Sequence, residues 1–234
     1  MKKIVLIAMI IVTGMYAKAQ ETMETAVSTD VVSQYIWRGQ DLGSVSLQPT
    51  LGIAYKGLSL TGWGSVGLSD PADTKEFDLT AAYAIGGMNI GITAYLFNAG
   101  LDPQNRYFKY DAHGTNHVFE ANIGYDFGVA SVQWYTNFAG NDGTNKDGKR
   151  DYSSYAEVSV PFKLASVDWT AKAGVVPTAT DFYGTTGFAV TNLSLQATKD
   201  IRVTDSFAIP VFAQVVANPC AQRAYLVFGL TLQP

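Results

Sequence analysis

Cysteine and histidine are scarce in this chain of 234 residues, and their scarcity excludes several kinds of chemistry. Cys220 is the single cysteine, so no disulfide can form within the chain. The two histidines, His113 and His117, stand four residues apart in a polar stretch that we interpret as a loop, whereas that spacing suits a metal ion on a helix. No serine, threonine or cysteine stands at a spacing from a histidine that would indicate a catalytic nucleophile and its base. We therefore predict no metal, no cofactor and no enzymatic activity.

Charge and long apolar runs are scarce as well. Lys, Arg, Asp and Glu make up 15% of the chain, with 20 acidic residues against 16 basic ones. The sequence thus lacks the basic patch that favours nucleic acid, and we predict no nucleic-acid partner. After the first 20 residues no apolar run approaches the ~18 residues of a membrane-spanning helix, and helical periodicity is missing.

The first 19 residues have the features of a secretory signal peptide. Lys2 and Lys3 precede the apolar run "IVLIAMIIVTGM", and "AKA" at Ala17–Ala19 is a small-x-small cleavage site. We therefore predict a signal peptide at 1–19 and a mature domain at 20–234. The residue directly after the predicted cleavage site is Gln20 and not cysteine, which disfavours a lipid anchor.

Alternation of apolar and polar side chains with a period of two is the dominant pattern. In "FDLTAAYAI" the side chains of Phe77, Leu79 and Tyr83 share one face, and those of Asp78 and Thr80 share the other. A Gly-Gly pair joins this run to "MNIGITAYLF", which is typical of a β-hairpin. The pattern predicts twelve strands, at 26–38, 46–56, 58–68, 76–85, 88–97, 117–126, 129–139, 154–162, 165–176, 187–198, 206–217 and 224–232.

Short and long connections alternate along these strands. The shortest ones follow the second, fourth, sixth and eighth strands, at Lys56-Gly57, Gly86-Gly87, Phe127-Gly128 and Lys163-Leu164. The intervening connections include the long polar stretches 98–116 and 140–154. This alternation predicts one all-β domain, an antiparallel transmembrane β-barrel of about twelve strands with short periplasmic turns and longer extracellular loops.

The two strand faces differ in a way that favours a membrane barrel over a soluble one. Gly, Ser, Thr, Asn, Gln and Ala dominate the polar face, whereas a soluble surface usually carries many Lys and Glu. Aromatic residues of the apolar parity fall near the strand ends, where rings favour the lipid headgroup level. The alternative is ordinary β-propensity, which enriches rings in any strand. The predicted aromatic girdle comprises Tyr35, Trp37, Tyr55, Phe77, Tyr83, Phe119, Tyr125 and Phe138.

The opposite parity lines the predicted lumen and carries more carboxylates than cations. A wide pore with acidic walls favours cations, whereas in a narrow lumen the same groups pair with one another. Twelve strands do not decide between these two cases. Predicted pairs are Arg38 with Glu76, and Lys172 with Asp168 or Glu157. The predicted lumen-lining residues that set its charge are Arg38, Glu76, Asp78, Glu120, Glu157, Asp168 and Lys172.

Two stretches of the chain resemble a known family. The opening "VSTDVVSQYIWRGQDLG" is similar to the opening motif of the Gcw family of conserved hypothetical proteins, and "IPVFAQVVANP" with "AYLVFGLTL" is similar to that family's closing strands. The resemblance implies an outer-membrane β-barrel. It brings no substrate and no catalytic residue with it.

The sequence therefore predicts a barrel in the outer membrane of a Gram-negative bacterium, in contact with outer-membrane lipid and with no oligomeric state assigned. Its predicted function is to bind or pass small polar solutes or cations. The first alternative is a plugged barrel with a structural or surface-interaction role. The second is a soluble periplasmic β-barrel that binds an apolar ligand.

Overall fold

A computed structural model describes residues 22–99, 106–111, 114–205 and 207–234. The predicted signal peptide, 1–19, lies outside the described residues, as do His113 and part of the connection 98–116. No helix in the described ranges is long and apolar enough to cross a membrane.

Twelve antiparallel strands form a closed barrel, and two short strands form a separate sheet. The barrel strands, in chain order, are β1 (Glu24–Val32), β4 (Ser46–Tyr55), β5 (Leu58–Gly67), β6 (Thr74–Ile85), β7 (Met88–Ala99), β8 (Val118–Asp126), β9 (Ser131–Gly140), β10 (Ser154–Leu164), β11 (Val167–Val176), β12 (Ala189–Arg202), β13 (Ala208–Asn218) and β14 (Arg223–Leu232). The separate sheet is the β2 (Tyr35–Trp37) and β3 (Gln40–Gly43) hairpin. The predicted fold class, a barrel of about twelve strands, is confirmed.

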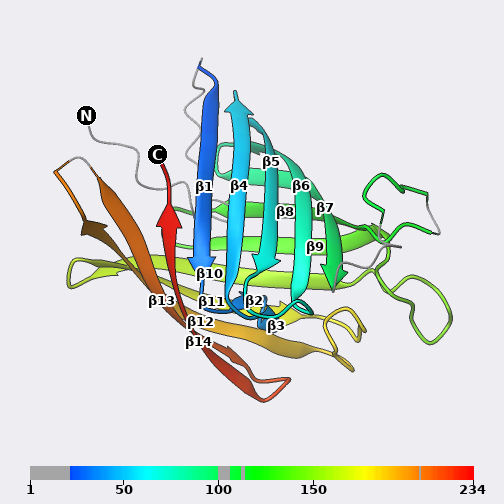
Figure 1. The fold of residues 1–234 in the computed structure, drawn as a ribbon. Coiled ribbons are helices and arrows are strands. Elements are labelled where there is room, and N and C mark those ends of the chain that lie inside the picture. The colour runs from blue at the N-terminus through cyan, green and yellow to red at the C-terminus, as the bar shows by residue number, and fades with distance from the viewer. Residues whose placement is uncertain (1–21, 100–105, 112–113, 206) are drawn as a thin grey trace.

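Each barrel strand pairs with its neighbour along the chain, and β1 pairs with β14 to close the ring (Figure 1). The closing ladder aligns four residue pairs, from Thr29–Leu232 to Val32–Gly229. The ladder between β1 and β4 aligns nine. We call the ladder between β1 and β14 the seam, and it is the shorter of the two ladders that β1 makes.

Tight turns gather at one end of the barrel, which we call the short-turn end; the other is the long-loop end (Figure 1). Gly86 and Gly87 both have positive φ, at 56° and 89°, as a two-residue hairpin turn requires. The turn predicted at Lys163-Leu164 is wrong by two residues. Both residues continue β10, and the turn lies at Ala165 and Ser166, which hold positive φ without being glycine.

The barrel is apolar outside and polar inside. Leu51 on β4, Ile123 on β8 and Leu226 on β14 point outward and are 65%, 53% and 56% exposed. Ser46, Gln48 and Thr93 point inward and are buried. Exposed aliphatic side chains on strand after strand make one apolar surface around the barrel, far more than a monomer normally leaves in water.

The first strand was predicted at 26–38, and its predicted C-terminal end is wrong. β1 stops at Val32, and Ser33 then donates its backbone N–H to the Phe228 carbonyl of β14 and accepts from the Phe228 N–H on its Oγ. Beyond Ser33 the chain leaves the wall and folds into the β2–β3 hairpin. Arg38 and Gly39 form its turn, with φ of 51° and 81°.

Two members of the predicted aromatic girdle are therefore misplaced. Tyr35 and Trp37 do not face outward: Tyr35 is 7% exposed, and Trp37 packs against Tyr95 and Phe97 of β7. Parity continued from Val31 places Tyr35 and Trp37 on the outward face, but the residues around Ser33, "VVSQYIW", do not alternate, and the chain leaves the wall there.

The other six predicted girdle residues point outward from the barrel. Tyr55, Phe77, Tyr125 and Phe138 are between 42% and 45% exposed, and Tyr83 and Phe119 are half-buried. Three of the six lie near the short-turn end and three near the long-loop end. Their contact with lipid headgroups stays a prediction.

A charge placed on the outer surface tests whether it faces lipid. Ile92 lies in the middle of β7 and is 51% exposed, whereas Met88 begins the same strand and is 39% exposed. We expect Ile92→Arg to lower the free energy of unfolding from lipid vesicles by about 2–4 kcal/mol and Met88→Arg by about 0–1 kcal/mol, because the cost of a charge depends on its depth. Equal effects at the two positions would contradict a lipid-facing band.

Candidate functional site in the barrel lumen

The β2–β3 hairpin crosses the inside of the barrel at its long-loop half. Tyr35 donates its hydroxyl hydrogen to Glu76 Oε2 on β6 at 2.8 Å. On another part of the wall, Asn218 Nδ2 of β13 donates to the Gly39 carbonyl at 3.1 Å. Four strands separate β6 from β13 along the shorter path around the ring. The hairpin therefore bridges the lumen.

Gly39 is fixed at the tip of the hairpin by two constraints. Its φ of 81° lies in the left-handed region, and a Cβ built there would collide with the backbone carbonyl of Thr191 on β12. The tip thus touches the wall directly, with no side chain between the two backbones.

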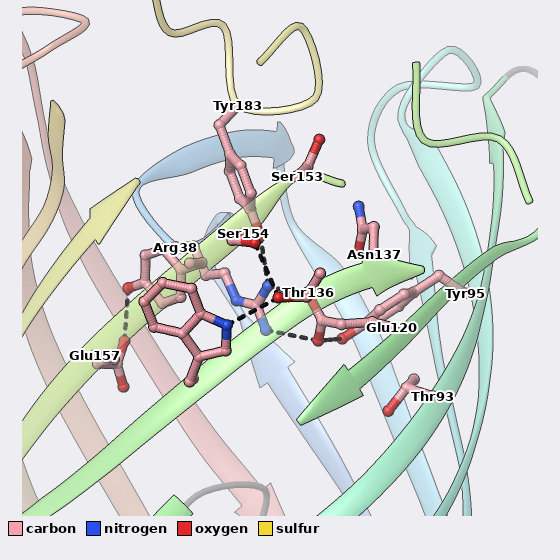
Figure 2. A network of polar contacts seen from close by, with 12 residues as sticks. Arg38, Thr93, Tyr95, Glu120, Thr136, Asn137, Ser153, Ser154, Glu157 and Tyr183 are labelled. Atoms are coloured by element: carbon pink, nitrogen blue, oxygen red, sulfur yellow. Dashed lines mark hydrogen bonds and ion pairs between the residues drawn. The ribbon is translucent and has the colours of Figure 1, made fainter. Parts of the chain in front are cut away.

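Arg38 is the centre of the lumen network. Its Nη1 lies 2.5 Å from Glu120 Oε2 and its Nη2 lies 2.9 Å from Glu120 Oε1, a two-pronged ion pair between the hairpin and β8 (Figure 2). Nη1 also donates to the Tyr183 hydroxyl at 2.5 Å. The two charged side chains are 8% and 2% exposed. Such a buried pair is sustained only by further hydrogen bonds to both partners.

Aromatic rings enclose the same guanidinium group. Its Cζ lies 4.0 Å from the centre of the Tyr135 ring, 4.3 Å from that of Trp37 and 4.8 Å from that of Tyr155. A cation over a ring face is attracted by the ring's quadrupole, and the attraction increases when water is excluded. Burial of Arg38 is therefore compensated by one carboxylate and three rings.

The carboxylates Glu120 and Glu157 are each held by a tyrosine. Tyr95 donates to Glu120 Oε1 at 2.8 Å, and Tyr155 donates to Glu157 Oε2 at 2.7 Å. Lys172 of β11 completes the second group, with its Nζ 3.2 Å from Glu157 Oε1. Both carboxylates thus have a cation and a hydroxyl donor.

Glu76 and Asp78 differ from the other two buried acids. They are 6% and 7% exposed, and no lysine or arginine among the described residues forms an ion pair with either. Their carboxyl groups lie within hydrogen-bonding reach of each other. Among the described residues, the buried hydroxyl of Ser65 on β5 has no hydrogen-bond partner, and no N–H or O–H group donates to Asp78 Oδ1.

The lumen differs in accessibility from one half to the other. In the long-loop half the hairpin and the rings bury the inward side chains. In the short-turn half many inward side chains stay partly exposed, and several are short. They include Asp30, Thr50, Ala54, Thr61, Thr80, Ala82, Asn122, Thr170, Lys172, Gln196, Thr198 and Gln214. Short polar side chains that remain accessible leave room for water and small solutes in this half.

The structure brings six of the seven predicted lumen residues to this network and places the seventh apart. Arg38 does not pair with Glu76, as predicted, but with Glu120, because the hairpin carries it across the lumen. Lys172 pairs with Glu157, one of its two predicted partners. Asp168 pairs instead with Lys163 at 3.1 Å near the short-turn end, where both side chains are more than two-thirds exposed.

Four tyrosines of the site were not predicted: Tyr95, Tyr135, Tyr155 and Tyr183. The first three lie on the lumen side of their strands, where the surrounding pattern is small or polar. A large ring on the polar parity of a strand is the signal that could have found these three. Tyr183 lies in the connection between β11 and β12, and no pattern marks it.

Residues 16–211 match the protein family described as "Bacterial protein of unknown function (Gcw_chp)". No protein of curated function matches the chain. Among solved structures, the crystal structure of an outer membrane channel from Pseudomonas putida F1 is similar, with 13% identity over 93% of this chain and 98% of that one and a TM-score of 0.43. That score does not establish a shared fold, and the architecture rests on the strand pairing above.

Removal of one partner of the Arg38–Glu120 pair tests how firmly the hairpin is held. Glu120→Gln leaves a buried guanidinium without its carboxylate, and we expect a loss of about 3–5 kcal/mol in the free energy of unfolding. Arg38→Met combined with Glu120→Leu removes both charges and should cost less than Glu120→Gln alone. Unfolding by denaturant from vesicles measures both variants. A larger loss in the double variant would contradict a paired, desolvated contact.

Proposed function

The chain belongs to the Gcw_chp family of bacterial proteins of unknown function, and we propose that it is an outer-membrane β-barrel for small polar solutes. In this proposal the solute enters the lumen through the short-turn end. The β2–β3 hairpin stops its passage at the long-loop half and opens to let it through.

The distribution of polarity supports the membrane location. The outer surface is an apolar band, and the lumen holds the hydroxyl, amide and charged groups. A soluble barrel for an apolar ligand needs the reverse, with polar side chains outside and apolar ones inside. The signal peptide predicted from the sequence agrees with export across the inner membrane.

One observation carries the gating proposal: the hairpin crosses the lumen and belongs to a sheet of its own. Strands β2 and β3 pair with each other and with no strand of the wall. Among the described residues, the hydrogen bonds that tie the hairpin to the barrel come from side chains, the Gly39 carbonyl and the chain ends at Ser33 and Ser44. Its displacement would therefore leave every barrel ladder intact.

The wall is already complete without the hairpin. Val32 of β1 and Ser46 of β4 are direct partners in their ladder, so a two-residue turn is long enough to join the two strands. Residues between them are therefore an insertion at the long-loop end. Their replacement keeps every aligned pair of the wall and removes the two hydrogen bonds between Ser33 and Phe228.

Replacement of residues 33–45 by Asn-Gly tests the gate. We expect this variant to give discrete current steps across a planar lipid bilayer at least several-fold larger or more frequent than the unmodified protein, because the lumen loses its stopper. Glu76, Asp78 and Glu120 then line the lumen without Arg38, so the current should be carried mainly by cations.

A matched control separates the gate from damage to the barrel. Replacement of 143–148, at the tip of the β9–β10 connection, by Asn-Gly shortens a long-loop-end connection without touching the lumen network, and it should leave the current unchanged. A hairpin variant that is inserted yet no more conductive than the unmodified protein would overturn the proposal. It would favour a permanently plugged barrel with a structural or surface-interaction role.

A further inference from the structure

The buried charges of the lumen are unequally balanced. Glu120 is paired with Arg38, and Glu157 is paired with Lys172. Glu76 and Asp78 have no such partner among the described residues, although both are more than nine-tenths buried. A buried carboxylate without a counter-charge is costly, so this pair has a place for a positive group.

The neighbouring strand adds a third polar group to the pair. Register places Ser65 of β5 directly opposite Glu76, and Trp63 directly opposite Asp78. Residues opposite each other on one face have Cβ atoms about 4.5–5.5 Å apart. Ser65 is fully buried on the lumen side, and its Oγ has no hydrogen-bond partner in the part of the chain that the structure describes. A buried hydroxyl without a described partner thus lies directly across the ladder from Glu76.

This group stands at the boundary between the two halves of the lumen. One step towards the short-turn end, the inward residues Thr61 and Thr80 are partly exposed. On the other side Tyr35 covers the pair, bonded to Glu76 and with its ring centre 5.6 Å from that of Trp63. A solute in the accessible half therefore reaches Asp78 before it meets the hairpin.

We infer that Glu76, Asp78 and Ser65 bind the ammonium group of a small amine. An ammonium group has three N–H donors and no acceptor, which match oxygens of Asp78, Glu76 and Ser65. The rings of Trp63 and Tyr35 stand beside the same space and attract a cation. This inference rests on the proposed function, since it names the class of solute that the accessible half takes.

The charge and number of ligands favour an amine over a metal ion. Glu76 and Asp78 lie two residues apart on one face of β6 and are both buried. Two like charges so close disfavour each other, so the pair suits one positive charge. Ca²⁺ takes six to eight oxygen ligands, and no cluster of three or more His, Cys, Asp or Glu that suits a metal occurs in the ranges that the structure describes. The ammonium group of an amine needs only three acceptors, one each from Glu76, Asp78 and Ser65.

Titration of the detergent-purified protein with ethylammonium chloride tests the site. Tryptophan fluorescence is followed at constant ionic strength, because Trp63 adjoins the site. We expect a saturable change that sodium chloride and tetramethylammonium chloride do not give, since neither of these cations donates hydrogen bonds. Asp78→Asn should weaken binding at least 10-fold and Ser65→Ala about 3-fold. Asp168→Asn, which removes the same charge near the short-turn end, should change nothing.

Other outcomes would overturn the inference in distinct ways. Equal binding by Asp78→Asn and Asp168→Asn would show that ethylammonium binds elsewhere or only through general charge. Saturation by tetramethylammonium would show that hydrogen bonds play no part. Saturation by calcium chloride and not by ethylammonium would assign the pair to a metal ion. No saturation by any of these probes would leave a buried carboxyl pair without a cationic ligand.

The same titration distinguishes this inference from the proposed function. It needs no membrane current, because it measures occupancy alone. Current through the hairpin variant without ethylammonium binding would reject the amine site and keep the gated barrel. Binding without current in that variant would keep the site and reject passage.

Discussion

The ion pair between Arg38 and Glu120 is the contact on which the arrangement of the lumen depends. It joins residues 82 apart in the chain and ties a hairpin with no ladder to the wall to one particular strand. Tyr95, Tyr135, Tyr155 and Tyr183 are arranged around it, as donors, acceptors or ring faces. Because both charges are buried, neither is tolerated without the other. The positions of the surrounding rings depend on the position of the guanidinium group.

The wall was predictable from the sequence because its rule is local. A residue two positions along a strand faces the same side, so the period of two predicts the strands, their faces and the inward acids without knowledge of their partners. The lumen contents follow no such rule. Whether Arg38 meets Glu76 or Glu120 depends on where the chain leaves the wall and on which strand the hairpin then meets. The loss of alternation in "VVSQYIW" marks the first of these and says nothing of the second.

Ser33 and the pair Arg38-Gly39 are the local features that end β1 and turn the hairpin. Ser33 uses its side chain on β14, and Gly39 has a left-handed conformation beside the Thr191 carbonyl. Neither residue type is distinctive by itself, since serines and glycines occur throughout the strands of this chain. Tyr35 and Trp37 were misplaced for the same reason: rings are common both at a lipid boundary and in a packed interior.

The position of Ser33 links the seam to the hairpin mechanically. The seam has only four aligned pairs, and beyond them Ser33 adds two hydrogen bonds to Phe228 at its long-loop end. The same residue is the hinge from which the hairpin departs. In the proposed gate, a hairpin that swings out of the lumen keeps every aligned pair of the wall, and the two Ser33 bonds to Phe228 are where its movement reaches the seam.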